Sequence, residues 1–275
     1  MIIACDLDGT LTDDQGVISA SNASGLRRAK EHGATCVLAT SRPSRCLDLP
    51  KRQLALFDCV LTCDGAERVS PDPAGVHLPL ASAAVQRLSH ALRAASITGA
   101  YAVEFGTNLG HEDGYTGWPA TDTGPRFLTG PLHALCAQGA VARVFFRPDP
   151  PNTARAAVEV LAAAAGDDIT FVTSEQPEST GLVQISGRAA TKGAALRAWL
   201  TATRRQGRLI AFGDQLNDLS LLDLADDAFA VGDAHPELLR RYTHLANDDS
   251  AAVARAIHRI LTPLPRRSSG RPHRS

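Results

Sequence analysis

The first residues of the chain hold the feature that most constrains its fold. Residues 2–5 (IIAC) form a short apolar run, and Asp6 and Asp8 follow it directly. Such a run is typical of a buried parallel strand, and α/β enzymes carry their reactive groups where such strands end. Because strand side chains alternate, both acids are expected on one side, and Gly9 lets the chain turn away. Taken alone, the pattern also fits an ordinary strand with an Asp-Gly turn.

A second apolar run ends in polar residues in the same way. Residues 34–39 (ATCVLA) have the pattern of a buried strand that closes in Thr40 and Ser41, and we expect a helix to begin at Pro43 behind them. Hydroxyl groups and the free amides of a helix start are suited to binding an oxyanion. Capping of that helix by the same hydroxyls is the simpler alternative.

A lysine and a further acidic loop extend the pattern. Lys192 stands at the start of an expected helix, where the helix dipole disfavours a cation, so an anion is expected nearby unless the lysine is simply solvated. Residues 208–212 (RLIAF) are another buried-strand run, and Asp214 and Asp218 follow it. Residues 57–63 are strand-like too and also end in polar residues. Polar residues at four such strand ends are hard to explain as ordinary surface residues.

The composition excludes several classes of function. The 275 residues are 44% hydrophobic, and 28 basic and 29 acidic residues give a formal charge of -1, so no global field attracts nucleic acid or an anionic membrane. The N-terminus has no signal-peptide pattern and no run could span a bilayer, which predicts a cytoplasmic protein. The six cysteines form no CxxC pair and are interpreted as reduced core residues. The arginine-rich residues 263–275 are interpreted as a disordered basic tail.

The order of elements predicts two domains. Strands and helices alternate over residues 1–78 and 188–262, as in a parallel sheet with crossover helices. Residues 79–187 are interpreted as an inserted α+β cap with a mainly antiparallel sheet, and residues 108–127 as a loop region with room for one short strand. The first expected helix begins at a cap at Ser21 or Asn22 and ends at about residue 31. The other expected helices cover residues 44–54, 80–96, 128–138, 152–165, 191–200, 219–225, 235–241 and 251–261.

Four aspartates are expected to gather at one edge of the core sheet. They are Asp6, Asp8, Asp214 and Asp218. That many hard oxygen ligands, without His or Cys, favour Mg²⁺ over zinc or copper. The Thr40 hydroxyl and the Lys192 ammonium suit phosphate oxygens, and a carboxylate can act as the nucleophile in phosphoryl transfer. There is no GxxxxGK[ST] or GxSxG motif to support a P-loop enzyme or an α/β-hydrolase.

These motifs together resemble those of a known family. DLDGTLT, LATSRP, the Lys192-Gly193 helix start and GDQLND, in this order, closely resemble the four motifs of the haloacid dehalogenase-like hydrolases. The long insertion between Thr40 and Lys192 resembles the C2 cap of the Cof-type branch, whose members are mostly phosphatases of sugar phosphates and related metabolites. The resemblance implies an α/β protein with a Rossmann-like parallel-sheet core and an inserted α+β cap of the C2 type.

The resemblance also implies a role for each matching residue. Asp6 would be the nucleophile and a Mg²⁺ ligand, and Asp8 would be the general acid and base and offer its backbone carbonyl to the metal. Thr40 and Lys192 would hold the transferring phosphoryl group. The other matching residues would ligate or support the metal (Asp214, Asp218), lie near the phosphate (Asn217), and shape the loops and supply backbone donors (Gly9, Ser41, Gly213).

The sequence departs from the family pattern around the leaving-group pocket. Ser41 stands where the family often has Gly, Asp64 where it often has Asn, and Gln215 where a small residue is common. No catalytic group is lost. We expect specificity to come from the cap, where a polar stretch is a candidate for contacting a polyol or amino-sugar leaving group, with a solvated loop as the simpler alternative. Its polar residues are Glu104, Asn108, His111, Glu112, Asp113 and Trp118.

The predicted function is Mg²⁺-dependent hydrolysis of a small phosphomonoester through an aspartyl-phosphate. The expected partner is a small phosphorylated metabolite, with no nucleic acid or membrane, and the expected state is a monomer or small homo-oligomer. A phosphomutase would use the same residues, and a phosphate-ligand sensor would bind without turnover. The sequence preserves both Asp6 and Asp8, which a pure sensor would not need.

Overall fold

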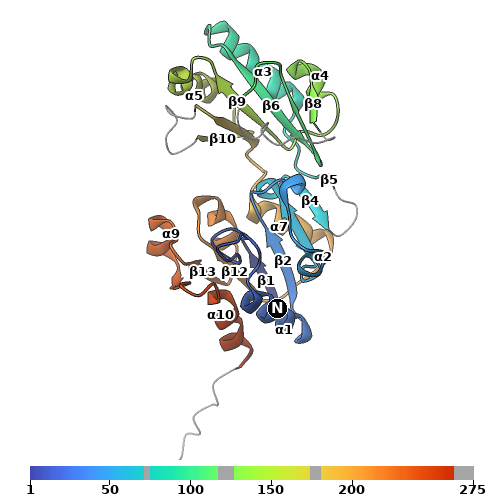
Figure 1. Cartoon of the computed structure of the whole chain (residues 1–275), viewed down its shortest axis with the longest axis vertical. Helices are drawn as coiled ribbons and strands as arrows, with labels where there is room; N and C mark the ends of the chain where they lie inside the picture. The colour runs from blue at the N-terminus through green and yellow to red at the C-terminus, as the bar shows by residue number, and fades with distance from the viewer. Residues whose placement is uncertain (71–74, 117–126, 174–180, 263–275) are drawn as a thin grey trace, which may run out of the picture.

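The chain folds into two layered units, one above the other (Figure 1). The computed structural model describes residues 1–70, 75–116, 127–173 and 181–262, so the predicted basic tail and Trp118 lie outside the described residues. Each unit has its own β-sheet, and the two sheets hold eight and six strands. The prediction of an α/β core with an inserted α+β cap is confirmed.

The core is built on a mostly parallel sheet. Its strands lie in the order β14-β13-β12-β1-β2-β3-β4-β5, and all neighbours from β14 to β3 are parallel, whereas β4 and β5 pair antiparallel. The strands are β1 (Ile2–Cys5), β2 (Thr35–Ala39), β3 (Cys59–Thr62), β4 (Glu67–Ser70), β5 (Gly75–Val76), β12 (Leu209–Gly213), β13 (Asp227–Val231) and β14 (Thr243–Leu245).

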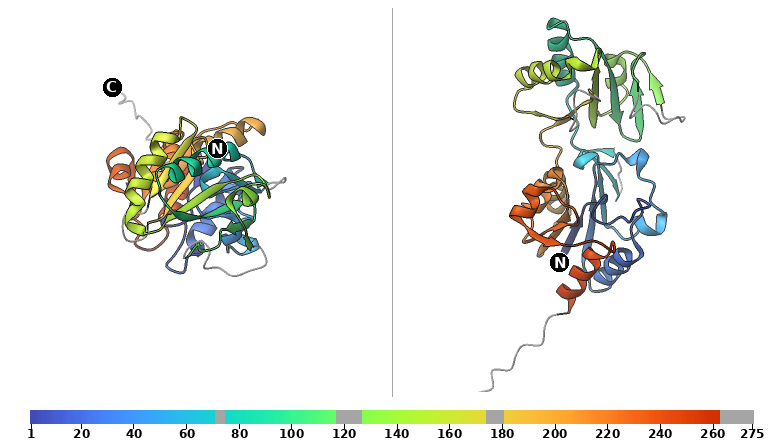
Figure 2. Two further views of the ribbon diagram at one scale, coloured as in Figure 1. Left: turned by 90° about the horizontal axis from the view of Figure 1, so that it is seen from above. Right: turned by 60° about the vertical axis from the view of Figure 1, so that its left-hand side comes forward.

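Alternation along β1 decides which face of the sheet each side chain joins. Ile3 and Cys5 pack in the cluster that includes α1 and α10, whereas Ile2 and Ala4 pack in the cluster that includes α7 and α8. Asp6 follows Ile2 and Ala4 at the same alternate spacing, so its side chain points toward α7. Figure 2 shows helices on both sides of this sheet. The core helices are α1 (Ala20–Glu31), η1 (Ser44–Cys46), α2 (Lys51–Leu54), η2 (Cys63–Gly65), α7 (Lys192–Ala202), η4 (Leu216–Asp218), α8 (Leu219–Leu222), α9 (Pro236–Arg241) and α10 (Ala252–Leu261).

Strand β1 lies where the order of strands in the core sheet changes direction. The first connections lead from β1 to β2 and β3, whereas the later strands β12, β13 and β14 extend the sheet the opposite way. In an open parallel sheet, such a reversal opens a crevice between the loops at the carboxyl ends of the two central strands. The loops after β1 and β12 therefore lie side by side.

The cap is an antiparallel sheet covered by helices on the face away from the core (Figures 1 and 2). Its strand order is β10-β11-β9-β6-β7-β8, and only the β7–β8 pair is parallel among the described strands. Alternate residues of β6 pack under the helices, which leaves Ala102 and Glu104 on the face toward the core. The elements are α3 (Ser82–Ala94), β6 (Gly99–Phe105), β7 (Asn108–His111), β8 (Phe127–Thr129), α4 (Leu132–Cys136), β9 (Arg143–Pro148), η3 (Pro151–Thr153), α5 (Ala154–Ala164), β10 (Ile169–Thr173) and β11 (Val183–Gly187).

The helix predicted over residues 44–54 is wrong. The segment holds two short pieces instead, η1 and α2, separated by an irregular stretch. Pro50 has no amide hydrogen to donate and disfavours a helical backbone at Leu49, so α2 can begin only after it. The helix start expected at Pro43 is thus a single 3₁₀ turn, which is too short to provide a helix-dipole site for an anion.

Several short elements also differ from expectation. Residues 128–138 are not one helix, because β8 occupies 127–129 and α4 begins only after Pro131. The N-cap of α1 is Ser19, whose side chain accepts from the Asn22 amide at 3.1 Å. Strands β4, β5 and β14 were not expected, since they are too short to reveal alternation and none of them is an uninterrupted apolar run like β1.

The described residues agree with two expectations drawn from composition. Across the described ranges, no helix is both long enough and apolar enough to cross a membrane. All six cysteines are free, and five of them are buried.

Candidate active site

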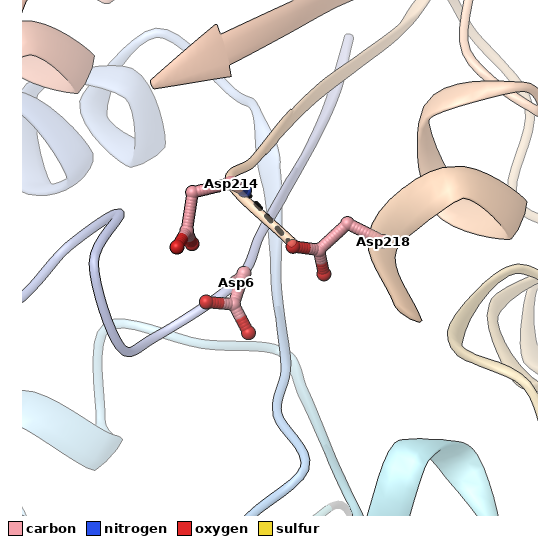
Figure 3. Close-up of side chains that lie close together, drawn as sticks. All are labelled: Asp6, Asp214 and Asp218. Atoms are coloured by element: carbon pink, nitrogen blue, oxygen red, sulfur yellow. Dashed lines mark hydrogen bonds between the residues drawn. The ribbon is translucent and has the colours of Figure 1, made fainter. Parts of the chain in front are cut away.

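Three carboxylates converge in the crevice between β1 and β12. Asp6 follows β1, Asp214 follows β12, and Asp218 ends the short helix η4. One carboxylate oxygen from each lies within 4.8 Å of those of the other two, and all three residues are buried (Figure 3). The structure therefore brings together three of the four predicted metal ligands.

Local hydrogen bonds orient the two acids of the GDQLND loop. The Asp218 Oδ2 atom accepts from the backbone amide of Asp214 at 2.9 Å (Figure 3). It also accepts from the backbone amide of Gln215 at 2.9 Å, so the loop folds around that carboxylate. Asp214 is held from both sides, because the Thr10 hydroxyl donates to its Oδ1 at 2.9 Å and the Gln215 amide donates to its Oδ2 at 3.0 Å. The loop thus presents both carboxylates at defined positions.

Lys192 lies between two of these acids. Its Nζ donates to Asp6 Oδ1 and to Asp218 Oδ1, both at 2.6 Å, and the residue is only 1% exposed. It is the first residue of α7, whose N-cap Thr191 accepts from the Ala194 amide. The anion that the sequence predicted beside this lysine is therefore a pair of carboxylates. With all groups ionised, three carboxylates and one ammonium leave a net charge of about -2 at the site.

The pKa values of Asp6, Asp214 and Lys192 are shifted by burial and by their neighbours. Burial raises the pKa of Asp6 well above its usual range, an effect that Lys192 opposes. It also raises the pKa of Asp214, against the hydrogen bond from Gln215. Burial alone would lower the pKa of Lys192, but the carboxylates of Asp6 and Asp218 outweigh it and the pKa is raised. The excess negative charge and the all-oxygen donor set fit a hard divalent cation.

We expect the affinity of this site for a divalent cation to fall steeply as the pH is lowered. The raised pKa values of Asp6 and Asp214 mean that these carboxylates take up protons at a higher pH than ordinary aspartates, and a bound cation must displace those protons. Titration calorimetry with Mg²⁺ in two buffers of different ionisation enthalpy would measure both the affinity and the protons released. An affinity that stays constant between pH 8 and pH 5 would contradict this assignment.

Gly9 allows the first loop to approach the second. Its backbone has φ of +78°, and a Cβ atom there would lie 2.4 Å from Asp214 Oδ2 and 2.8 Å from its Cγ. Such distances are shorter than any real carbon contact, so an added methyl group must displace the Asp214 carboxylate. Only glycine satisfies both the left-handed backbone and the close approach.

We therefore expect Gly9→Ala to weaken cation binding by about tenfold or more and to destabilise the protein by roughly 1–3 kcal/mol. Gly33→Ala is the matched control, because Gly33 has nearly the same φ, +77°, but no atom within 4 Å of an added Cβ. Calorimetric affinity and thermal unfolding of the two variants separate the clash from the backbone strain. Equal affinities in both variants would show that Gly9 does not control the position of Asp214.

Asp8 lies apart from the three-carboxylate cluster. Its side chain is 48% exposed and forms a two-point ion pair with Arg42, whose Nε donates to Oδ2 at 2.9 Å and whose Nη2 donates to Oδ1 at 2.5 Å. Asp8 thus faces Arg42 and is partly exposed, unlike the three buried carboxylates. Arg42 is a further candidate site residue that the motifs do not predict; its place in LATSRP, two residues after Thr40, is the sequence signal for it.

The predicted phosphate-binding residues come from loops. Thr40 is fully buried, and its Oγ1 accepts from the Arg42 amide at 3.1 Å. Asn217 is exposed, and its side chain donates to Asp64 Oδ1 at 2.8 Å, so it faces the loop after β3. Asp64 has a left-handed backbone, with φ of 55°, which is strained for a residue other than glycine. Its contact with Asn217 makes Asp64 a second candidate residue, which the sequence marks only by its departure from the family pattern.

Two of the cap residues proposed to contact a leaving group have internal partners. Glu104 is 1% exposed and is paired with Arg45 and Arg143. Glu112 accepts from the backbone amides of Tyr101 and Leu132. These carboxylates are therefore held by the protein itself, and Trp118 lies outside the described residues.

Comparisons with known proteins relate the chain to one family and one fold. A protein-family model described as haloacid dehalogenase-like hydrolase matches residues 3–257. No curated protein sequence matches the chain. Among solved structures, one from Thermotoga maritima has 18% identity and a TM-score of 0.79, with 95% of this chain and 98% of that chain covered.

Two further structures are similar over the same extent. A haloacid dehalogenase-like hydrolase from Bacteroides thetaiotaomicron has 23% identity and a TM-score of 0.72, with 94% of this chain and 98% of that one covered. A sugar phosphatase of subclass IIB of the haloacid dehalogenase superfamily has 14% identity and a TM-score of 0.73, with the same coverage. At these identities the structures establish a shared fold that includes both core and cap.

Proposed function

Since the chain belongs to the haloacid dehalogenase-like hydrolase family, we propose that it is a Mg²⁺-dependent phosphatase that hydrolyses a small phosphomonoester through an aspartyl-phosphate. The observation that carries this proposal is the position of Asp6 at the end of β1, beside Lys192 and within 4.8 Å of the Asp214 and Asp218 carboxylates. A nucleophile, a cation and a site for a hard metal ion thus meet at one point. Sugar phosphates are the first substrates to test, because one structure with the same fold is described as a sugar phosphatase.

The reaction divides into two steps in this proposal. A carboxylate oxygen of Asp6 attacks phosphorus, the bond to the ester oxygen breaks, and Asp8 donates a proton to the departing alcohol. Asp8 then removes a proton from water, which attacks the aspartyl-phosphate and releases inorganic phosphate and the Asp6 carboxylate. The Lys192 ammonium and the Thr40 hydroxyl, with backbone amides of Ser41 and Gly9, stabilise the phosphoryl oxygens. Mg²⁺ bound by Asp6, Asp214 and Asp218, with the Asp8 carbonyl, would add positive charge beside these oxygens.

The proposal assigns chemistry and specificity to different parts of the chain. Residues 1–78 and 188–262 form the catalytic core, and residues 79–187 form the cap that covers the leaving group. Covering the site would exclude water while the first step takes place. A cytoplasmic location is part of the same proposal and rests on the sequence alone.

Phosphate release from a panel of esters tests the proposal. The panel should include sugar phosphates, amino-sugar phosphates, nucleotides and pyridoxal phosphate, each assayed with Mg²⁺ and with a chelator. We expect release that the chelator abolishes. An isomerised sugar phosphate without free phosphate would indicate a mutase instead, and tight binding without turnover in Mg²⁺-loaded protein would indicate a sensor.

A further inference from the structure

A group of contacts joins the cap to the segment that directly follows Thr40. The Arg143 Nη1 atom of the cap donates to the Ser41 carbonyl at 3.1 Å, although the two residues are 102 positions apart. The Ser44 hydroxyl donates to the Gly106 carbonyl at 3.4 Å. The cap therefore contacts the core at the loop that is expected to bind the phosphoryl group.

A buried ion network fixes the direction of the Arg143 side chain. Glu104 and Arg143 are register partners on β6 and β9, and the Arg143 Nε atom donates to Glu104 Oε2. Glu104 Oε1 accepts from the core residue Arg45, with its Nη2 at 2.9 Å and its Nε at 3.2 Å. The side chains are 1%, 3% and 6% exposed for Glu104, Arg143 and Arg45. Buried charges of this kind need defined geometry, so the guanidinium has little freedom to turn.

Three successive carbonyl groups of the loop are held by donors. The Thr40 carbonyl accepts from the Asp64 amide at 3.1 Å, and the Arg42 carbonyl accepts from the Cys63 amide at 3.0 Å. Backbone donors of the core thus hold the two outer carbonyls. The middle one, that of Ser41, is held by the side chain of Arg143 from the cap.

One peptide unit connects Arg143 to the Thr40 hydroxyl. The Ser41 carbonyl and the Arg42 amide belong to the same planar peptide and point in opposite directions, so a contact that fixes one fixes the other. The Arg42 amide donates to Thr40 Oγ1 at 3.1 Å. Because that oxygen accepts from the backbone, the hydroxyl hydrogen of Thr40 remains available to a phosphoryl oxygen. A charged donor on the carbonyl also polarises the peptide and strengthens the amide as a donor.

We propose that Arg143 is a positioning residue that orients the Thr40 hydroxyl toward the transferring phosphoryl group through the Ser41–Arg42 peptide. The inference rests on the proposed function and adds that the cap helps to complete the phosphoryl-binding loop. Only arginine can serve here, because Nε holds Glu104 while Nη1 holds the Ser41 carbonyl, and lysine has a single nitrogen. The third nitrogen of Arg143, Nη2, is buried and has no hydrogen-bond partner within the described ranges.

Arg143→Lys tests the proposal, because it keeps the cation for Glu104 but cannot hold both partners. We expect kcat for phosphate release to fall by about 10- to 100-fold with KM changed by less than about threefold, as for loss of one orienting contact. The loss should be the same for esters with different leaving groups, since the contact acts on the transferring group. Arg87→Lys is the control: Arg87 is also a cap arginine that donates to backbone carbonyls and a carboxylate, those of Ala164, Ala165 and Asp168.

A double-mutant cycle shows whether the effect passes through Thr40. In a Thr40→Val background the hydroxyl is absent, so adding Arg143→Lys should lower kcat by less than a further factor of about two. If the losses of kcat in the two single variants multiply in the double variant, the proposal is overturned. It is also overturned if kcat of Arg143→Lys stays within twofold of wild type, or if its loss of kcat depends on the leaving group. If Arg143→Lys does not fold, Arg143→Met removes the donor to the Ser41 carbonyl while Glu104 stays paired with Arg45, and it should show the same fall in kcat.

The two proposals fail in distinguishable ways. A wild-type protein that releases phosphate from no ester contradicts the proposed function. In that case calorimetry with orthovanadate, which can adopt the five-coordinate geometry of the phosphoryl-transfer transition state, still tests the role of Arg143, and an affinity within twofold of wild type in Arg143→Lys would overturn it. An active wild type with an unchanged Arg143→Lys variant overturns this inference alone.

Discussion

Asp6→Asn is expected to reduce phosphate release by at least about 10³-fold, because an amide cannot serve as the nucleophile that accepts the phosphoryl group. The fold should survive the change. Burial raises the pKa of Asp6, so its ionised form costs the metal-free protein stability at neutral pH, and a neutral amide removes that cost. Lys192 retains Asp218 as a partner at 2.6 Å. Phosphate release and thermal unfolding of the metal-free protein measure the two effects.

Asp58→Asn is a matched control for this substitution. Asp58 also neighbours a core strand and accepts a backbone hydrogen bond, from the Cys36 amide at 2.9 Å, but it pairs with Lys30 outside the crevice. We expect that variant to keep its activity and to lose a little stability. Full phosphate release by Asp6→Asn would remove Asp6 as the nucleophile and, with it, the proposed mechanism.

Lys192→Met should have two large effects. Loss of the ammonium is expected to lower phosphate release by about 10²-fold or more, since a charged donor to the phosphoryl group disappears. It also leaves the Asp6 and Asp218 carboxylates buried without the cation that lies 2.6 Å from each. Breaking a buried ion pair from one side costs roughly 3–5 kcal/mol, so the metal-free protein should unfold at much lower urea concentration.

The stability loss in Lys192→Met should depend on pH and on Mg²⁺. As the pH falls through the raised pKa values of Asp6 and Asp214, these carboxylates become neutral and no longer repel, so the loss should shrink toward acid pH. Saturating Mg²⁺ should restore part of the stability, because a bound cation replaces the missing charge. Urea unfolding at pH 8 and pH 5, with and without Mg²⁺, tests both statements.

Lys30→Met is the control for Lys192→Met. Lys30 pairs with Asp58 at 3.2 Å, but both side chains are partly exposed, and ion pairs of that kind contribute about 0–1 kcal/mol. An equal loss of stability in the two lysine variants would mean that the buried carboxylates do not depend on Lys192.

The sequence predicted the core well, because its signals are long and repeated. Apolar runs of four or more residues identified the strands that make up the centre of the parallel sheet, and the alternation with helices predicted the fold class. Predictions failed where elements are short. Proline interrupts residues 44–54, and the two to four residues of β4, β5 and β14 carry too little pattern to be recognised.

The sequence by itself determined which groups meet at the carboxyl ends of β1 and β12, because parallel strands in one sheet deliver their following residues to one edge. Asp6, Asp214 and Asp218 could be placed together for that reason, whereas Asp8, predicted with them, pairs with Arg42 instead. Only the tertiary structure decided how their charges are balanced and how the cap reaches the loop that follows β2. Lys192 contacts Asp6 across 186 positions, and Arg143 contacts Ser41 across 102. Such contacts arise from the docking of whole elements, which no local spacing in the sequence records.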